Sequence, residues 1–564
     1  MTVLFNDPHT FADESIQAFA RANPEAVLLV DGGVVRATAA PGKRVAVVSG
    51  GGSGHFPAFA GWVGEGLLDG AACGAIFSSP SQRQITTVAR SADNGAGILF
   101  VPINYAGDIL HFGGAAEELR ADGLDVRMVP ITDDIASGSS SEASSRRGIA
   151  GSFPVVKILG AAAAKGASLE ELERLAIRAN DATRSFGVAF SGCTLPGADH
   201  PLFEVESGRM AVGLGIHGEP GISDAPIGTA NEVADLILDG LFVERQPENG
   251  RGVALLVNGL GTTKYDELHL VLARAADRLQ AEGMIVVAPV VGELVTSLDM
   301  AGVSISLTYL DDDLKRYWLA PASSPAFTRT APVRHESRRT AWSAGPGRVF
   351  RQGSKESQQN ALQIHAALEQ AAAALRRHEV ALGDLDAVAG DGDHGIGMVR
   401  GVNGALEAAV SAIAAGAGAS TTLRAAGDKW SDASGGTSGA LWGAGLISAA
   451  RVISDEREVT GVDVIAAAAS FAQAVVDRGG AKVGDKTMLD AIAPFVAELK
   501  RLFTGGTDLA AAWSGAAMAS TNAAAKTAGS AASRGRSRLH GPRSIGHADP
   551  GATSFALIVS SIDL

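Results

Sequence analysis

Three aspartates and several glycines are concentrated in one short segment. Residues 385–395 read Leu-Asp-Ala-Val-Ala-Gly-Asp-Gly-Asp-His-Gly, which places Asp386, Asp391 and Asp393 close together in the chain. Glycine permits tight backbone turns, and these would bring the three carboxylates into one small volume. Such carboxylates repel one another unless a hard cation lies among them, and a cation with open positions can also hold phosphate oxygens. An ordinary Asx-turn and helix N-cap ahead of Met398 is the alternative, and this segment alone leaves both open.

Two further regions in the same part of the chain could contact a phosphate. Segment 434–439, Ser-Gly-Gly-Thr-Ser-Gly, precedes an apolar helix that we expect to begin near residue 440. Glycines let the backbone approach an anion, and the helix N–H groups and the hydroxyls of Thr437 and Ser438 can donate to it. Arg536 and the segment 547–553, His-Ala-Asp-Pro-Gly-Ala-Thr, form the other region. Any one of these is consistent with helix capping, but together with the aspartates they predict a nucleotide phosphate site with Mg²⁺.

The sequence does not contain a Walker A motif. Gly484-Asp-Lys-Thr487 resembles the end of such a motif, but the order Gly-Lys-Thr is absent. An ordinary P-loop kinase is therefore excluded, and the loops described above would have to hold the nucleotide.

Three segments of the first half combine glycine with histidine or aspartate. An expected strand, 44–49, runs into Gly50-Gly-Gly-Ser-Gly-His55, and open α/β sheets bind ligands at the carboxyl ends of their strands. The alternative for this segment is a tight turn with a buried histidine. A second strand end carries the segment 104–108, Asn-Tyr-Ala-Gly-Asp.

The third segment, 213–221, contains His217 between glycines. It formally matches G-x-G-x-x-G, but Glu-Pro-Gly follows where a helix should begin, so we reject a dinucleotide-binding interpretation. A histidine flanked by glycines on a loop is accessible and could act as a nucleophile or a base.

The elements that position these segments differ between the two halves. Aliphatic and β-branched segments of the first half predict strands over 26–30, 44–49, 97–102, 126–131, 253–257, 284–291 and 303–310. Helical patterns lie between them, over 114–123, 151–184, 230–241 and 265–283. This alternation predicts sheets covered by helices.

Residues 329–351 have prolines, glycines and scattered charges without a period, and we interpret them as a linker. Beyond Lys355, segments rich in Ala, Leu and Ile predict helices over 357–382, 398–414, 439–453, 462–477, 487–503 and 507–528. Only the tail, 554–558, fits a strand as well as a helix. The second half should therefore be an all-α domain whose loops carry the polar chemistry.

Composition restricts the partners and the compartment. With 564 residues the chain should form more than one domain, and a net charge of −14 argues against nucleic acid or an anionic membrane as the main partner. No segment of about 18 apolar residues predicts a membrane span. The N-terminus lacks the basic region of a signal peptide, and the two cysteines, Cys73 and Cys193, fit a reducing compartment. We therefore expect a cytoplasmic protein.

Taken together, these segments resemble the dihydroxyacetone kinase family in its single-chain, ATP-using form. Five motifs occur in the family's order, namely Gly-Gly-Gly-Ser-Gly-His, Gly-Ile-His-Gly-Glu-Pro-Gly, Gly-Asp-Gly-Asp-His-Gly, Gly-Asp-Lys-Thr-Met-Leu-Asp and Asp-Pro-Gly-Ala. The resemblance covers nearly the whole chain. It implies an α/β ketose-binding domain of two subdomains over 1–332, a linker over 333–354, and an all-α, eight-helix-barrel domain for ATP and Mg²⁺ over 355–564. It also implies a homodimer, in which the two kinds of domain could be paired across subunits.

The resemblance assigns a role to each matching residue. His217 would add its ring nitrogen to the substrate ketone to give a hemiaminal, and His55 with Asp108 would be the acid/base pair that activates the terminal hydroxyl. The residues implied around the substrate are Gly51, Gly52, Ser53, Gly54, Phe56 and Ile103. The ligands implied for Mg²⁺, present as two ions, are Asp386, Asp391 and Asp393. The residues implied around the nucleotide are His394, Gly395, Gly397, Thr437, Ser438, Gly479, Met488, Arg536, Asp549, Pro550 and Gly551.

Two positions depart from the family members that act on dihydroxyacetone. Those members usually have Glu after the loop histidine and Lys before Asn-Tyr, where this chain has Phe56 and Ile103. Both changes remove a charge and keep the local balance, which predicts a remodelled pocket for a four-carbon ketose such as D- or L-erythrulose. Dihydroxyacetone (glycerone) kinase is the first alternative. An FAD-AMP lyase that forms cyclic FMN and a non-catalytic ketose-sensing regulator are the others.

Overall fold

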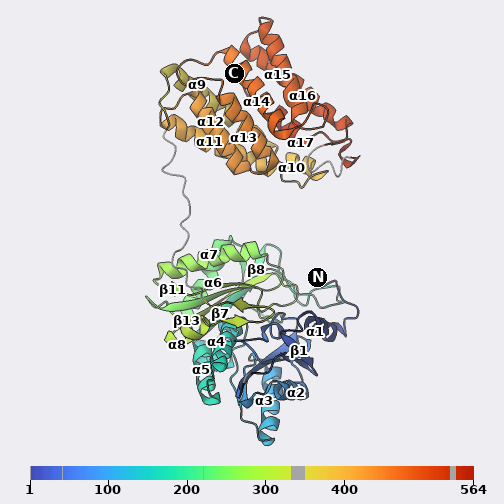
Figure 1. Cartoon of the computed structure of the whole chain (residues 1–564), viewed down its shortest axis with the longest axis vertical. Helices are drawn as coiled ribbons and strands as arrows, with labels where there is room; N and C mark the ends of the chain where they lie inside the picture. Colours follow the sequence, from blue (N-terminus) through green and yellow to red (C-terminus); the bar gives the residue numbers. More distant parts are fainter. Residues whose placement is uncertain (1, 41, 220, 332–349, 534–541) are drawn as a thin grey trace. The chain divides into compact units, whose positions relative to one another are not determined.

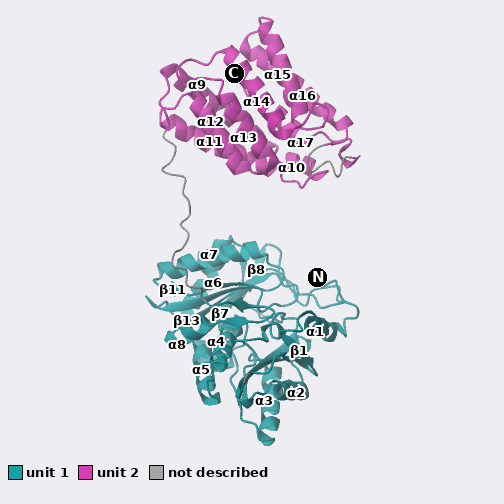
Figure 2. Cartoon of the chain, viewed as in Figure 1, with its two compact units in different colours: residues 1–338 teal, residues 339–564 magenta. Residues whose placement is uncertain are grey.

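The computed structural model describes residues 2–40, 42–219, 221–331, 350–533 and 542–564. The chain forms two compact units, residues 1–338 and 339–564 (Figure 2). Most of the predicted linker, 333–354, lies outside the described residues. None of the helices within the described ranges is long and apolar enough to cross a membrane.

The N-terminal unit contains a six-stranded mixed sheet (Figure 1). Its strand order is β1 (Val27–Val30), β2 (Gly33–Arg36), β4 (Gly70–Ile76), β3 (Arg44–Ser53), β5 (Gly95–Phe100) and β6 (Val126–Met128). Side chains of the central strand β3 alternate between two cores, as the pleat of a strand requires. Val45 and Val47 lie in the core that contains helix α4 (Ser152–Ala164). Ala46 and Val48 lie in the core that contains α2 (Gln82–Ala92) and α3 (Ala106–Ala121).

A second, mainly antiparallel sheet of seven strands completes the unit. Its order is β11 (Ile285–Val286), β10 (Gly252–Gly259), β13 (Gly302–Leu310), β7 (Thr183–Ala189), β8 (Arg209–Val212) and β9 (Ser223–Pro226), and β12 (Val290–Gly292) also pairs with β10. Helices α6 (Ala230–Glu244) and α7 (Tyr265–Ala281) cover one face. The remaining elements are α1 (Phe11–Ala22), α5 (Leu169–Asp181), α8 (Asp312–Trp318), β14 (Ala322–Ser323) and β15 (Thr328–Arg329).

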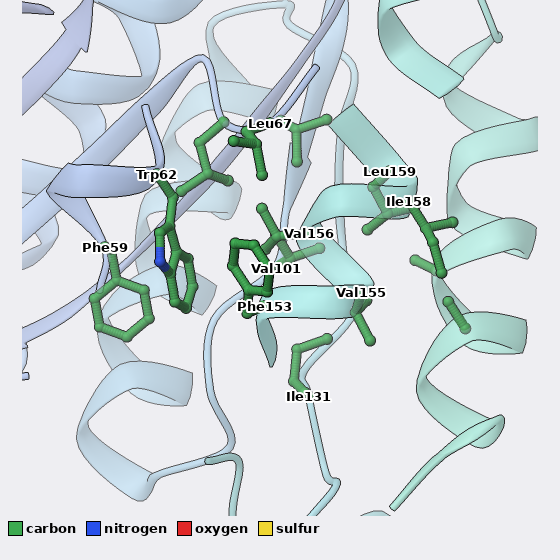
Figure 3. Packing of buried hydrophobic residues seen from close by; sticks show 14 of the residues in the cluster. Phe59, Trp62, Leu67, Val101, Ile131, Phe153, Val155, Val156, Ile158 and Leu159 are labelled. Atoms are coloured by element: carbon green, nitrogen blue, oxygen red, sulfur yellow. The ribbon is translucent and has the colours of Figure 1, made fainter. Parts of the chain in front are cut away.

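Helix α4 connects the cores of the two sheets. It is apolar on nearly all sides, a pattern typical of a helix without a solvent face. Residues of α4 pack with Val47 of the first sheet and Leu256 of the second in one core. Figure 3 shows part of this core, in which the ring of Phe153 lies edge-on to that of Trp62, with centroids 5.6 Å apart. This core fixes the position of β3, and with it the residues that follow β3.

The sequence located several elements of this unit wrongly. The glycines at 50–52 were expected in a loop, but β3 continues through Ser53 and pairs with β4. Glycine is needed in this part of the strand because neighbouring groups pack directly against the backbone. A Cβ on Gly51, for example, would lie 2.5 Å from the ring of Phe59. The region 151–184 is not one helix but α4, α5 and the start of β7. The elements that were not predicted are β2, β4, β7, β8, β9, β14, β15, α1, α2 and α8.

The C-terminal unit is helical throughout its described residues, as predicted. Its helices are α9 (Lys355–Arg377), α10 (Glu379–Ala387), α11 (His394–Ala414), α12 (Ala419–Ser434), α13 (Gly436–Ala450), α14 (Gly461–Gly479), α15 (Leu489–Thr504), α16 (Leu509–Lys526) and α17 (Pro550–Ser561). Their apolar faces share one core. The predicted helix 357–382 is two helices, α12 was missed, and the ambiguous tail is the helix α17.

Candidate active site

Two histidines face each other in the N-terminal unit. His55 follows β3 and is completely buried, and His217 lies in the loop between β8 and β9. Their Nε2 atoms are 2.9 Å apart. The Nδ1 atom of His55 lies 2.8 Å from the carbonyl oxygen of Thr296, and that of His217 lies 3.0 Å from a carboxylate oxygen of Glu219. The glycine-flanked loop selected from the sequence thus places His217 in contact with the buried His55.

The hydrogen-bond partners assign the protons of this pair. The carbonyl of Thr296 and the carboxylate of Glu219 can only accept, so both Nδ1 atoms carry hydrogen. If both rings were neutral, two lone pairs would face each other across 2.9 Å and repel. One proton must therefore lie between the Nε2 atoms. Burial and the charge of His217 lower the pKa of His55 to about 3.

Glu219 holds His217 in this tautomer. Burial alone would raise the pKa of Glu219, but the hydrogen bond and charge of His217 outweigh it and lower the pKa to about 2. The guanidinium of Arg147 lies 3.8 Å from the same carboxylate and is itself paired with the buried Asp134. Burial raises the pKa of Asp134 to about 6, which the charge of Arg147 partly offsets. Sequence reasoning did not assign a role to Glu219, although its position two residues after His217 was a usable signal.

Asp108 lies near the histidine pair, in the first turn of α3. It is 4% exposed, and its Oδ1 atom has no hydrogen-bond partner among the described residues. Burial raises the pKa of Asp108 to about 6, although a hydrogen bond with Ser79 and the charge of His217 oppose this shift. A carboxylate with a pKa near neutrality is suited to accept a proton in catalysis.

An aromatic frame fixes the two histidine rings. The ring of Phe77 is stacked on His55, with centroids 5.0 Å apart, and lies edge-on to His217 at 5.1 Å. Tyr105 is edge-on to His217 at 4.7 Å. Phe77 has a φ of +53°, a left-handed conformation that is costly for an aromatic residue and that tends to persist at functional sites. Neither Phe77 nor Tyr105 was among the predicted site residues.

The predicted substrate-binding residues differ in their position and in their exposure to solvent. Gly51, Gly52 and Ser53 are the end of β3, and Gly54 follows with a φ of +98°. Phe56 is 57% exposed, and its ring lies edge-on to that of Phe19 at 5.5 Å.

Ile103, by contrast, is 2% exposed and belongs to the core around α4. Core packing is therefore a second reason for an aliphatic side chain at this position, beside contact with a substrate. Phe56 and Ile103 thus differ in their surroundings, since one side chain is exposed and the other belongs to the core.

The three aspartates of the C-terminal unit do come together. One carboxylate oxygen each of Asp386, Asp391 and Asp393 lies within 4.8 Å of the other two. Asp386 lies in the last turn of α10 and accepts a hydrogen bond of 2.9 Å from the backbone N–H of Gly392, whose φ is +78°. Three carboxylates at this spacing form the all-oxygen ligand set that Mg²⁺ or another hard cation prefers. The residues therefore fit the predicted metal.

Three helix N-termini meet beside these aspartates. His394 begins α11, and its Nε2 lies 2.9 Å from the hydroxyl of Ser554 in α17. Its Nδ1 lies 3.4 Å from the hydroxyl of Ser438 in the first turn of α13. Free N–H groups and helix dipoles make such ends favourable for phosphate. Asp549 caps α17, and burial, together with nearby carboxylates that include Asp386, raises its pKa to about 7.

The other predicted nucleotide residues are distributed around this point. Helix α13 begins at Gly436 rather than near residue 440, so Thr437 is exposed in its first turn. Met488 precedes α15, and a Cβ on Gly551 would lie 3.2 Å from it. Pro550 is the first residue of α17, Gly479 is the last residue of α14, and Gly397 is in the first turn of α11.

Gly395 has a structural reason to be glycine, because a Cβ there would lie 1.9 Å from the carbonyl oxygen of Glu379. Arg536 lies outside the described residues.

Each of the two units matches a known family model. Residues 17–326 match the Dak1 domain, and residues 388–563 match the DAK2 domain. The chain belongs to the dihydroxyacetone kinase family. It is 51% identical to the L-erythrulose 1-kinase of Mycolicibacterium smegmatis over 100% of this chain and 99% of that protein. It is 46% identical to the D-erythrulose kinase of the same organism, over 100% of this chain and 98% of the relative.

One solved structure is similar to this protein over nearly its whole length. The dihydroxyacetone kinase from C. freundii, in complex with AMP-PNP and Mg²⁺, matches with a TM-score of 0.59 and 30% identity, over 99% of this chain and 98% of that one. The predicted family and the predicted fold class, α/β followed by all-α, are thereby confirmed.

Proposed function

We propose that this chain is an ATP-dependent kinase that attaches a short-chain ketose to His217 and phosphorylates its terminal hydroxyl, with erythrulose as the preferred substrate. The pairing of His217 with His55 and Glu219 carries the proposal, because it presents one nitrogen whose proton can leave. Relatives named L- and D-erythrulose kinases, 51% and 46% identical over the whole chain, support the choice of ketose.

Attachment of the ketose requires the proton between the two histidines to move. His55 accepts this proton on Nε2, which leaves a lone pair on the Nε2 of His217. That lone pair attacks C2 of the ketone, the carbonyl π electrons go to oxygen, and the oxygen takes the proton from His55. The product is a hemiaminal whose positive imidazole ring keeps its Nδ1–H on Glu219, so charge and protons balance. A reversible bond of this kind gives a small polyol affinity that few other contacts could supply, and it rejects glycerol.

Phosphorylation would use the remaining residues of both units. Asp108 accepts the proton of the terminal hydroxyl, because its raised pKa makes it a better base than an exposed carboxylate. Asp386, Asp391 and Asp393 would hold Mg²⁺, which neutralises charge on the transferred phosphate. The N–H groups at the starts of α11, α13 and α17 hold the phosphates of ATP.

The finer points of the proposal rest on the resemblance. We place two Mg²⁺ ions at the aspartates. The nucleotide contacts are His394, Gly395, Gly397, Thr437, Ser438, Gly479, Met488, Arg536 and the segment 549–551. We further propose a cytoplasmic homodimer in which the ketose-binding domain, 1–332, and the ATP-binding domain, 355–564, work on one substrate. The two cysteines are free thiols, as a reducing compartment allows.

Steady-state kinetics with ATP test the choice of substrate. We expect kcat/KM to be highest for one enantiomer of erythrulose, lower but measurable for dihydroxyacetone, and absent for glycerol. The difference between the ketoses should be modest, about 1–3 kcal/mol in transition-state free energy, because shape discriminates weakly between carbon-sized groups. A clear preference for dihydroxyacetone over both enantiomers would contradict the erythrulose assignment. Turnover of glycerol would contradict the role of His217.

A further inference from the structure

The hydroxyl of Tyr105 is buried and has no hydrogen-bond partner among the described residues. Tyr105 precedes α3 and lies three residues before Asp108. A buried hydroxyl without a partner destabilises the folded state, because it has lost its hydrogen bonds to water. Native proteins seldom keep such a group unless a ligand or an ordered water satisfies it.

Tyr105 packs against the histidine to which the ketose would be attached. Its ring is edge-on to that of His217, with centroids 4.7 Å apart and planes at 87°. The Oδ1 atom of Asp108 is the other buried polar atom of this site without a partner. Two unsatisfied groups, three residues apart at the start of α3, therefore lie near one histidine.

The charges around Tyr105 keep its hydroxyl protonated. Burial and the negative charges of Glu219, Asp134 and Asp133 raise the pKa of Tyr105 well above its usual value, and Arg147 only partly opposes them. The phenol therefore stays a hydrogen-bond donor at all physiological pH values, and a polyol offers several oxygens that can accept from it.

We infer that the Tyr105 hydroxyl donates a hydrogen bond to an oxygen of the ketose held on His217. Tyr105 is then a substrate-binding residue of the reaction proposed above, and the inference rests on that proposal. A site built to hydrogen-bond a substrate hydroxyl discriminates strongly, because its own buried group is left unpaired without the substrate. The unpaired hydroxyl destabilises the free protein, and this free energy is regained when the ketose binds and accepts the hydrogen bond.

The substitution Tyr105→Phe removes only the oxygen atom and separates binding from folding. We expect the Kd for erythrulose to rise roughly tenfold or more, since one hydrogen bond in such a site is worth about 1.4 kcal/mol or more. The Tm of the free protein should stay the same or rise, because an unsatisfied buried group has been removed. Binding is measured without ATP, from the ¹³C NMR signal of erythrulose labelled at C2, which moves when the ketone becomes a hemiaminal.

Tyr309→Phe is the matched control. The Tyr309 hydroxyl donates a 3.0 Å hydrogen bond to the carbonyl of Arg245, far from His217 in the sheet. This variant should show the opposite result, with a lower Tm and an unchanged Kd for erythrulose.

The outcomes separate this inference from the proposed function. An unchanged Kd in Tyr105→Phe, with normal adduct formation in the unsubstituted protein, would overturn the role of Tyr105 alone. A lowered Tm with an unchanged Kd would overturn it too, and would assign the hydroxyl to a structural water. If the unsubstituted protein gave no hemiaminal signal at all, the proposed ketose chemistry would fall first and this inference with it.

Discussion

The two candidate sites of this chain are constructed in opposite ways. Around His217 the side chains are buried or partly buried and already in contact: Glu219 and His55 hold its two ring nitrogens, and Phe77 fixes its plane. At the second site, Asp391 and Asp393 are exposed, and like charges lie within 4.8 Å of one another. The first site is organised by packing and hydrogen bonds, and the second brings like charges together in a ligand set that suits a cation.

The difference follows from the chemistry that each site would perform. A covalent bond to a small ketone needs one nitrogen at a fixed place, and this favours a rigid site without water. A nucleotide and its metal must bind and leave in each cycle, and this favours an accessible site whose attraction is electrostatic. We therefore expect substitutions to act on ketose attachment through geometry, and on phosphoryl transfer through charge.

The largest expected effect is the loss of kinase turnover in Asp391→Asn. The substitution keeps the size of the side chain and removes one of the three charges that would hold Mg²⁺. Phosphoryl transfer depends on neutralisation of the phosphate charge, so turnover should fall below detection. Attachment of erythrulose to His217, measured by ¹³C NMR, should be unchanged because it needs no metal.

Asp384→Asn is the control for that experiment. Asp384 is an exposed residue of the same helix, α10, and is not a member of the acidic cluster. It should retain turnover, and Mg²⁺ should raise the Tm of this variant as in the unsubstituted protein but not that of Asp391→Asn. Near-normal turnover of Asp391→Asn at saturating Mg²⁺ would refute the metal assignment.

The next largest effect should come from His55→Ala. In the proposed reaction His55 accepts the proton that lies between the two histidines and assists proton removal from the ketose, so kcat should fall by roughly 10²–10⁴. The hemiaminal signal should form more slowly in this variant, while the Tm shift caused by Mg²⁺ stays intact. His269→Ala, at an exposed histidine of α7, is the matched control and should have no effect. If KM alone changed, His55 would be a binding residue and Asp108 the sole base.

The same contrast explains which parts could be predicted from the sequence. The acidic site was predictable because Asp386, Asp391 and Asp393 are near neighbours in the chain, so a few turns suffice to gather them. The fold class was predictable from the change of hydrophobic pattern near Lys355. By contrast, the partners of His55 come from distant segments: Thr296 and His217 are brought to it only by tertiary packing. Phe77 lies in no segment that the sequence singled out, and Tyr105 was part of the selected segment 104–108 without being recognised as a neighbour of His217.

Missed elements have equally specific causes. Strand β4 reads Gly-Ala-Ala-Cys-Gly-Ala-Ile, a sequence with low β-propensity, and it forms because β3 and β2 pair with it on both sides. Helix α12 contains Gly427, which lowers helix propensity but lets α13 approach, since a Cβ there would lie 2.9 Å from the Cβ of Leu446. In both cases packing against a neighbouring element determines the secondary structure, although the local sequence favours another conformation.

The smallest expected effect concerns stability, and it tests whether burial governs the ketose site. Burial raises the folded-state pKa of Asp108 to about 6, whereas in the unfolded chain this pKa has its ordinary value of 3.8. The folded state therefore favours the protonated carboxyl. The stability that this provides is complete below about pH 4 and is lost as the pH rises through about 6. At pH 8 the protein keeps a buried ionised carboxylate.

Asp108→Asn should consequently stabilise the protein at pH 8 by about 2 kcal/mol, and this gain should disappear toward pH 4. Urea unfolding at a series of pH values measures it, and Asp181→Asn, at an exposed aspartate ending α5, should show no such dependence. The same variant should lose turnover because the base is gone, so that stability and activity change in opposite directions. If Asp108→Asn were less stable than the unsubstituted protein at pH 8, then the carboxylate would be satisfied in the free enzyme. The ketose site would then be held by charge, as the acidic site is, and the contrast between the two would fail.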